Sequence, residues 1–97
     1  MRRTIHRRDR DHNALTAELR RLGTPHIDCH NYGGGMGDVL ARHRDGKAVF
    51  IELKSSPKDK LTPAEARFSE LFPNNWVRAN SVDEALESLG ITTREMS

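Results

Sequence analysis

The chain has 97 residues, of which 35% are hydrophobic and 31% charged, and its formal net charge at pH 7 is +2. This length suits one small domain, and the sequence has no apolar run near the ~18 residues that a membrane span needs. A single cysteine, Cys29, excludes an internal disulfide bond and is typical of a reducing compartment. The basic start of the chain has no apolar signal segment, so we expect a soluble, cytoplasmic protein that has no membrane contact.

Positive charge gathers at the start of the chain, over residues 1–8, whereas acidic residues gather near its end. Such a basic arm could contact the phosphate groups of a nucleic acid, with salt-sensitive binding. The alternative is a solvated, frayed terminus, and the arm alone leaves both interpretations open. The candidate phosphate-binding residues of the arm are Arg2, Arg3, Arg7 and Arg8.

Residues 8–22 are predicted to form a helix. Leu15, Leu19 and Leu22 have the spacing of one apolar helix face, and Gly23 ends the pattern. Asp9 and Asp11 lie near the helix start, where carboxylates complement the helix dipole. The alternative is that one of them reaches a metal site elsewhere in the fold.

Residues 26–30 alternate enough for a short strand, with Ile27 and Cys29 facing inward. His26, Cys29 and His30 suggest zinc, but strand alternation separates Cys29 from His30, and no Cys-x-x-Cys pair supplies further ligands. The glycine-rich segment 31–37 follows. It is either a flexible loop or a backbone, at Gly34 and Gly35, that can approach a phosphate group closely.

Residues 37–54 read as two strands joined by a tight turn, and the turn leaves two registers open. A two-residue turn at Asp45 and Gly46 would put Asp38 on the opposite face from Glu52. A three-residue loop over 44–46, with Gly46 in the left-handed region, brings Asp38 opposite Glu52. We expect this second register.

The second strand of this hairpin, residues 48–53, is apolar on both faces until Glu52, which indicates a central strand covered on two sides. Glu52 and Lys54 project from the same face because side chains alternate along a strand. An unpaired charge on a buried strand is costly, and a metal ion or a lysine partner would explain Glu52. An ordinary Glu52–Lys54 ion pair is the structural alternative.

A polar loop with Lys58 and Lys60, two further candidate phosphate contacts, leads to a helix from Pro63. Thr62 and Glu65 form the capping box of this helix. Its predicted core residues are Phe68, Leu71 and Phe72, followed by a strand at 76–79 and a helix at 82–89 with a second capping box from Ser81 to Glu84.

The predicted element order is αβββαβα, an α/β domain with a mixed central β-sheet flanked by helices. One domain spans residues 1–97, with its core at about 8–90 and a C-terminal tail at 92–97. The strand at 76–79 follows a helical crossover, so it should pair in parallel with the strand that carries Glu52.

Gly37-Asp38, the segment from Val49 to Lys54, and the helix start from Leu61 to Glu65 together resemble the PD-(D/E)xK, restriction endonuclease-like nucleases. Within them the chain is most similar to the compact VRR-NUC type, over about residues 8–90. In two places it departs from the pattern. The motif's proline is Gly37 here, and Glu65 stands where VRR-NUC proteins usually have glutamine.

The resemblance implies a Mg²⁺-dependent nuclease, with Asp38 and Glu52 as metal-binding carboxylates and Lys54 as the catalytic lysine. The Leu53 backbone carbonyl could add a metal ligand, and Asp11 and Glu65 are possible additional acidic residues. The chemistry agrees, because carboxylate oxygens suit Mg²⁺ or Mn²⁺ and a lysine beside the ion can stabilise developing negative charge.

The sequence therefore predicts a metal-dependent DNA endonuclease, selective for branched or Holliday junction-like DNA. Because one small domain offers a single metal site, we expect a homodimer. Trp76 and the helix around Phe68 and Phe72 could supply its contact surface, but for each aromatic residue alone core packing is the favoured role. The alternative is a non-catalytic nucleic-acid-binding module that retains the nuclease fold.

Overall fold

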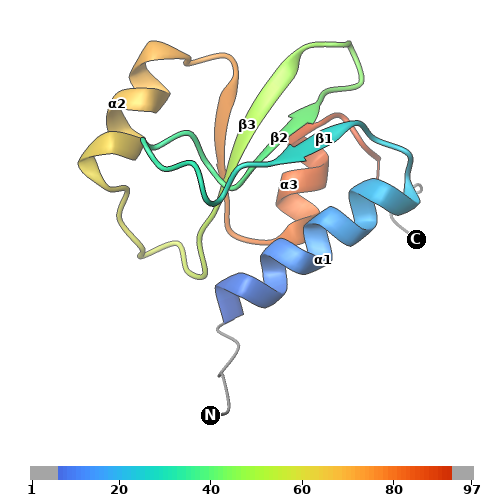
Figure 1. Ribbon diagram of the computed structural model, residues 1–97, viewed down its shortest axis with the longest axis horizontal. Coiled ribbons are helices and arrows are strands. Elements are labelled where there is room, and N and C mark those ends of the chain that lie inside the picture. Colours follow the sequence, from blue (N-terminus) through green and yellow to red (C-terminus); the bar gives the residue numbers. More distant parts are fainter. Residues whose placement is uncertain (1–6, 93–97) are drawn as a thin grey trace.

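The computed structural model describes residues 7–92, which fold into three helices and four strands (Figure 1). The predicted arm residues Arg2 and Arg3, and the tail beyond residue 92, lie outside the described residues, as do the side chains of Arg7 and Arg8. The predicted element order αβββαβα is confirmed. In chain order the elements are α1 (Arg7–Arg21), β1 (His26–Asp28), β2 (Val39–Arg42), β3 (Ala48–Leu53), α2 (Pro63–Leu71), β4 (Trp76–Ala79) and α3 (Val82–Ser88).

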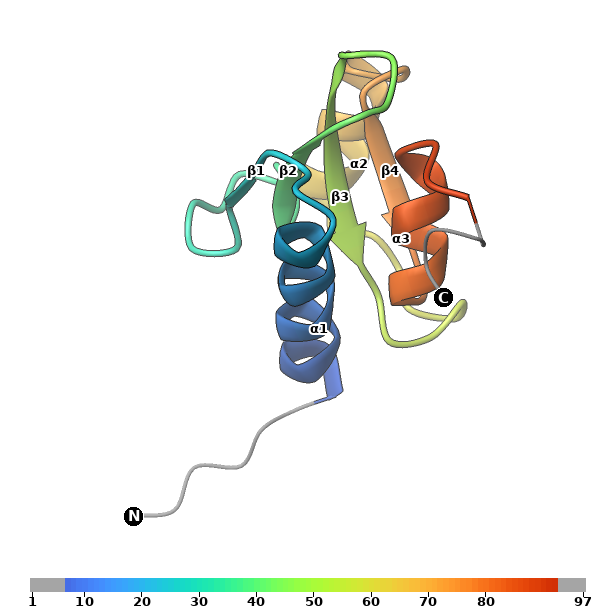
Figure 2. The same ribbon diagram turned by 90° about the vertical axis from the view of Figure 1, so that its right-hand side faces the viewer.

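The four strands form one mixed sheet in the order β1-β2-β3-β4. β1 to β3 pair antiparallel, whereas β4 pairs parallel to β3, as the helical crossover predicted. Figures 1 and 2 show α2 on one side of the strands and α1 with α3 on the other. The chain is thus a small α/β domain. Among the described residues, no helix is both long and apolar enough to cross a membrane.

The hairpin between β2 and β3 adopts the predicted second register. Val39 lies opposite Ile51 and Arg42 lies opposite Ala48. Its turn is closed by a 2.8 Å hydrogen bond from the His43 amide to the Lys47 carbonyl, and Gly46 has a φ of +101°. Glycine tolerates this φ at little cost, so Gly46 permits the three-residue loop that fixes the pairing.

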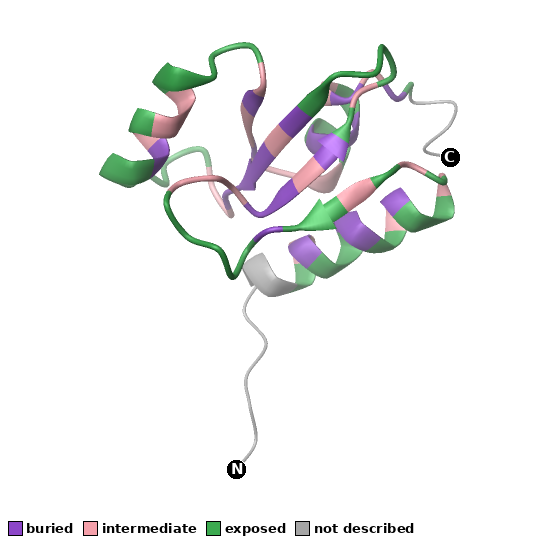
Figure 3. Ribbon diagram, turned by 45° about the horizontal axis from the view of Figure 1, so that its top comes forward, coloured by how far each residue is buried: buried purple, intermediate pink, exposed green. Residues whose placement is uncertain are grey.

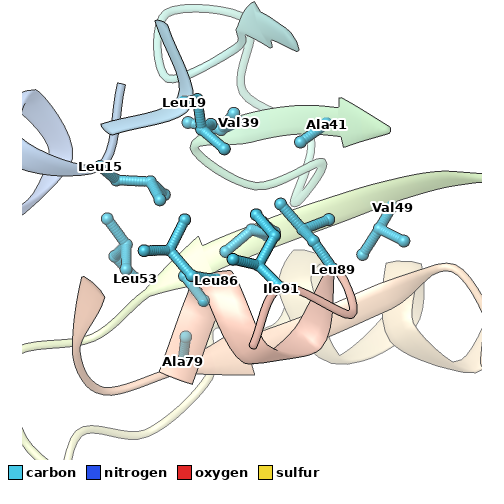
Figure 4. Packing of buried hydrophobic residues seen from close by; sticks show 12 residues of the cluster. Leu15, Leu19, Val39, Ala41, Val49, Leu53, Ala79, Leu86, Leu89 and Ile91 are labelled. Atoms are coloured by element: carbon cyan, nitrogen blue, oxygen red, sulfur yellow. The ribbon is translucent and has the colours of Figure 1, made fainter. Parts of the chain in front are cut away.

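The main core lies between the sheet and the helices α1 and α3 (Figure 4). The odd-numbered residues of β2 and β3 face this side because side chains alternate along a strand. They meet Leu15 and Leu19 from α1 and Leu86 and Leu89 from α3, all of which are fully buried. The leucine spacing of α1 therefore gives the helix the apolar face that the sequence predicted.

The opposite face of the sheet is covered unevenly, and here two sequence predictions are wrong. Phe50 packs on Phe68 with 5.0 Å between ring centroids, but Leu71 and Phe72 are 60% and 44% exposed rather than buried. Ile27 is 54% exposed, not inward-facing, because it lies opposite Leu40 at the β1 edge, whereas α2 covers β3 and β4. Figure 3 shows most of β1 as exposed.

Trp76 packs in the core, the role that the sequence analysis set beside a contact surface. Its side chain is 7% exposed, and its indole N–H donates a 3.2 Å hydrogen bond to the Gly35 carbonyl. Gly35 in turn lies against the start of α2, where a Cβ atom would come within 2.2 Å of the Ala64 carbonyl oxygen. The glycine-rich loop is therefore anchored at Gly35 by close packing.

We predict that Gly35→Ala destabilises the fold more than Gly33→Ala does. Both glycines have positive φ, +79° and +71°, but a Cβ atom at Gly33 has no neighbour within 4 Å among the described residues. The Gly33 variant should lose about 1–2 kcal/mol from backbone strain, and the Gly35 variant a further ~1–3 kcal/mol from overpacking. Urea unfolding of both variants is the measurement, and equal losses would contradict the packing argument.

Candidate active site

Asp38, Glu52 and Lys54 meet at the end of β3, on the side of the sheet that faces α2. Glu52 lies in β3 and Lys54 follows it by two residues, so both project toward α2, as Phe50 does. Asp38 directly precedes β2, and its amide donates a hydrogen bond to the Ile51 carbonyl, so Asp38 lies beside the last residues of β3. The register thus places Asp38, Glu52 and Lys54 at the same end of the hairpin.

All of these side chains are buried. Asp38 is 4% exposed, Glu52 2% and Lys54 8%. The Lys54 ammonium nitrogen lies 3.4 Å from Glu52 Oε2 and 2.8 Å from Glu65 Oε1, so one lysine joins two carboxylates. At such low exposure an unbalanced charge would cost free energy, so the charged groups of this cluster are expected to have partners.

Asp38 is held by the backbone of β3. Its Oδ2 accepts a 2.8 Å hydrogen bond from the Leu53 amide, and its own amide donates to the Ile51 carbonyl at 2.7 Å. Gly37, just before it, has a φ of +116°, and a Cβ atom there would come within 2.9 Å of the Ile51 carbonyl oxygen. Proline, whose φ is fixed near −65°, cannot adopt this backbone, so glycine is required here.

Glu65 is both a helix cap and a partner of Lys54. Its Oε1 accepts a 2.9 Å hydrogen bond from the Thr62 amide, and its amide donates to Thr62 Oγ1 at 3.1 Å, so the predicted capping box is confirmed. Burial raises the pKa of Glu65, but hydrogen bonds with Lys54, the Thr62 amide and the Glu52 side chain, together with the charge of Lys54, outweigh it and lower the pKa overall. Glu65 therefore stays ionised beside Lys54 near neutral pH.

Other predicted residues lie farther out. Asp11 is half-buried on α1, the helix that packs on the opposite face of the sheet from Lys54. Lys58 and Lys60 are exposed in the loop after β3, and Gly34 is exposed with open space around it. These positions are accessible to a large ligand but contribute no contact to the buried cluster among the described hydrogen bonds and ion pairs.

The sequence analysis missed Arg78, which pairs with Glu52 in the parallel register of β3 and β4. Its guanidinium donates hydrogen bonds to the Ser56 carbonyl at 2.8 Å and to Asn80 Oδ1 at 3.3 Å. The signal was present, since Arg78 is a charged residue inside a strand predicted to lie beside Glu52. Through the hydrogen bond to Ser56, Arg78 links the loop after Lys54 to β4.

His26, Cys29 and His30, for which the sequence analysis argued against a zinc site, make separate contacts. His26 Nδ1 contacts the Thr24 carbonyl oxygen at 2.9 Å, and Cys29 Sγ donates to the Ile27 carbonyl at 3.4 Å. Burial raises the pKa of the Cys29 thiol, which disfavours the reactive thiolate. His30 contacts Asp28 instead, in a separate cluster with His12.

The second predicted capping box is half formed. Ser81 Oγ accepts a hydrogen bond from the Glu84 amide, but the Glu84 carboxylate accepts one from the Asn80 amide instead of the Ser81 amide.

Comparisons of the chain with family models, with curated proteins and with solved structures gave no match. The case for a function therefore depends on the geometry of the cluster itself.

The cluster contains ligand types that suit a hard divalent cation. Lys54 pairs with the carboxylates of Glu52 and Glu65, and the carboxylate of Asp38 is held by the Leu53 amide at the same end of β3. Carboxylate oxygens are the preferred ligands of Mg²⁺ and Mn²⁺. Asp38 and Glu52 are the two carboxylates that the sequence predicted as metal ligands.

We predict that Glu65→Gln lowers stability at neutral pH by about 1.5–3 kcal/mol, the usual worth of a hydrogen bond to a charged group. Glutamine can still accept the Thr62 hydrogen bond, but it loses the charge that pairs with Lys54. The folded-state pKa of Glu65 lies below its ordinary 4.5, so its contribution is present above that pH and is lost as pH falls through the folded value.

The measurement is urea unfolding of both proteins between pH 7 and pH 3. The stability gap between wild type and variant should narrow below about pH 4.5. Glu70→Gln, at an exposed position on the same helix, is the matched control and should leave stability nearly unchanged at all pH values. A gap that stays constant with pH would contradict the assigned charge on Glu65.

Proposed function

We propose that this protein is a Mg²⁺-dependent nuclease of the PD-(D/E)xK type, with a restriction endonuclease-like core. The observation that carries the proposal is the buried cluster of Asp38, Glu52 and Lys54 at the end of β3. The register that core packing requires also brings Asp38 to the end of β3, and Gly37 lets the backbone before Asp38 approach Ile51 closely. Together they supply two metal-binding carboxylates and one cationic group within a single patch.

A purely structural ion pair explains the cluster less well. Burying charged groups costs free energy, and a structural network offsets that cost by matching opposite charges. Here Lys54 pairs with both Glu52 and Glu65, and Asp38 lies at the same end of β3, held by the Leu53 amide. Three carboxylates at one strand end are a ligand set that suits a divalent cation, which supports a metal site over a simple pair.

In this proposal Asp38 and Glu52 hold the ion, and the Leu53 carbonyl, between Glu52 and Lys54 in sequence, is a candidate third ligand. When bound, Mg²⁺ polarises a phosphate group and lowers the pKa of a bound water molecule, and Mn²⁺ can substitute. Lys54 orients the attacking water and stabilises negative charge on the phosphate oxygens. Glu65 holds the Lys54 side chain in place and keeps it protonated.

DNA is the proposed substrate, and branched or junction DNA the preferred form. Lys58 and Lys60 are exposed in the loop that follows Lys54, so they can contact the backbone next to the cleaved phosphate. The arginines at the start of the chain would add contacts that depend on salt concentration. The alternative function is a nucleic-acid-binding module without catalysis.

Lys54→Met and Asp38→Asn should each abolish cleavage, with a loss of at least about a hundredfold, because a preorganised charge at the reacting phosphate is removed. Asparagine is the better replacement for Asp38 because its carbonyl oxygen can still accept the Leu53 amide. The assay is cleavage of labelled linear, nicked, flapped and four-way-junction DNA in Mg²⁺ or Mn²⁺. Lys58→Met is the matched control, a lysine loss outside the buried cluster.

Two results would overturn the nuclease. One is cleavage by both variants at the wild-type rate, which would point to a contaminating enzyme. The other is a wild type that binds these DNAs without cutting any of them in either metal, which would favour the binding module. Circular dichroism and thermal melting of each variant establish that a lost activity is not a lost fold.

The proposal includes a homodimer, since two related sites could act on the two strands of a branched duplex. Light scattering should then give about twice the monomer mass of 11.0 kDa. Leu71, 60% exposed at the end of α2, is the proposed contact, so Leu71→Gln should shift the mass toward the monomer. Ile27→Gln, 54% exposed at the far edge of the sheet, is the control. A wild-type mass near 11 kDa would refute the dimer.

A further inference from the structure

A second cluster of metal-ligating side chains lies between α1 and β1, two elements that pack side by side in Figures 1 and 3. His12 comes from α1, Asp28 ends β1, and His30 follows two residues later. One ligand atom from each of the three lies within 4.8 Å of the other two. Nothing in the proposed nuclease site uses these residues.

Asp28 is the centre of this cluster. Its Oδ2 lies 2.9 Å from His12 Nε2, and its Oδ1 lies 2.5 Å from His30 Nδ1. Partial burial raises the pKa of Asp28, but hydrogen bonds from His30 and His12 outweigh this and hold it at about 2. The carboxylate is therefore ionised over the whole physiological range, as a metal ligand must be.

The cluster is partly open to solvent. The side chains of Asp28 and His30 are 48% and 46% exposed, whereas His12 is 7% exposed on the inner side. His12 Nδ1 is buried without a hydrogen-bond partner among the described residues. This nitrogen is the other ring nitrogen from Nε2, which contacts Asp28, so Nε2 is the ligand atom that His12 offers to the cluster. An ion can thus reach the cluster from solution and find one ligand already fixed.

We propose that His12, Asp28 and His30 form a binding site for a divalent transition metal ion, with Zn²⁺ the favoured occupant. Imidazole nitrogens with a carboxylate suit zinc, cobalt and nickel rather than magnesium. Ligand bonds of about 2.0–2.2 Å in a tetrahedron set ligand atoms about 3.3–3.5 Å apart, so small side-chain rotations complete the site. Three protein ligands leave a fourth position for water.

Because the site lies between α1 and β1, a bound ion would affect the stability of the fold. A bound ion would crosslink α1 to β1, and the Cys29 amide, next to Asp28, donates a 2.8 Å hydrogen bond to the Asp38 carbonyl. The ion would therefore stabilise β1 and, through this hydrogen bond, the backbone of Asp38. It would do so from the face of the sheet opposite to the carboxylate cluster. Its binding is independent of whether the carboxylate cluster cleaves DNA.

The test is a titration of the full chain, first stripped of metal with a chelator, with Co²⁺ and then Zn²⁺ at pH 7.5. Co²⁺ should give the visible absorption of a four- or five-coordinate site, and Zn²⁺ should displace it at one equivalent. Calorimetry supplies the Zn²⁺ affinity, and thermal melting supplies a second readout because a ligand that binds the folded state raises the melting temperature.

His30→Ala and Asp28→Asn should weaken Zn²⁺ binding at least about tenfold, since loss of an outer-shell partner alone commonly costs that much. His30 is the safer position because its side chain is half-exposed, so the variant should fold. His26→Ala removes a nearby histidine outside the cluster, and Asp38→Asn disables the carboxylate site; both should bind Zn²⁺ like wild type.

Two results would overturn the site: no saturable Zn²⁺ or Co²⁺ binding by the wild type, or equal affinity in wild type and His30→Ala. Zn²⁺ binding lost in Asp38→Asn but kept in His30→Ala would assign the ion to the carboxylate cluster instead.

Discussion

The register of the β2–β3 hairpin is the constraint on which the rest of the site depends. Gly46, at φ +101°, allows a three-residue loop, and that loop sets Val39 opposite Ile51. A slip by one residue would turn every side chain of one strand to the other face. Asp38 would then face α1 while Glu52 faced α2, and Val39 would leave the core. Core packing and the carboxylate pair thus select the same register.

Local signals in the sequence predicted most of the helices and strands. Which parts of each sheet face are covered by helices could be seen only in the three-dimensional structure. The capping box at Thr62 and Glu65, the leucine spacing of α1 and the parallel β4 each follow from a few neighbouring residues. Ile27 was placed wrongly because alternation gives two faces without saying which one is covered. Its exposure results from α2 lying over the other half of the sheet.

The same limit applies to the site. Asp38, Glu52 and Lys54 were found because hairpin pairing and strand alternation are short-range rules. The contact between Lys54 and Glu65 spans eleven residues and depends on how the loop after β3 returns α2 to the sheet. His12 and Asp28, sixteen residues apart on a helix and a strand, share no local pattern at all. Their meeting depends on the packing angle of α1, which no spacing rule encodes.

The two clusters differ in their ligand atoms, so they would prefer different metal ions. The cluster at Lys54 offers oxygen ligands beside a fixed positive charge, which suits a hard cation that is balanced by several carboxylates. The cluster at Asp28 offers two imidazoles and one carboxylate, a set that binds zinc more tightly than magnesium. Strand alternation separates them, since Asp28 pairs with Val39, whose side chain faces the core under α1, while Glu52 faces α2. A sheet four strands wide can therefore carry two cation sites of different preference, linked through the backbone bond from Cys29 to Asp38.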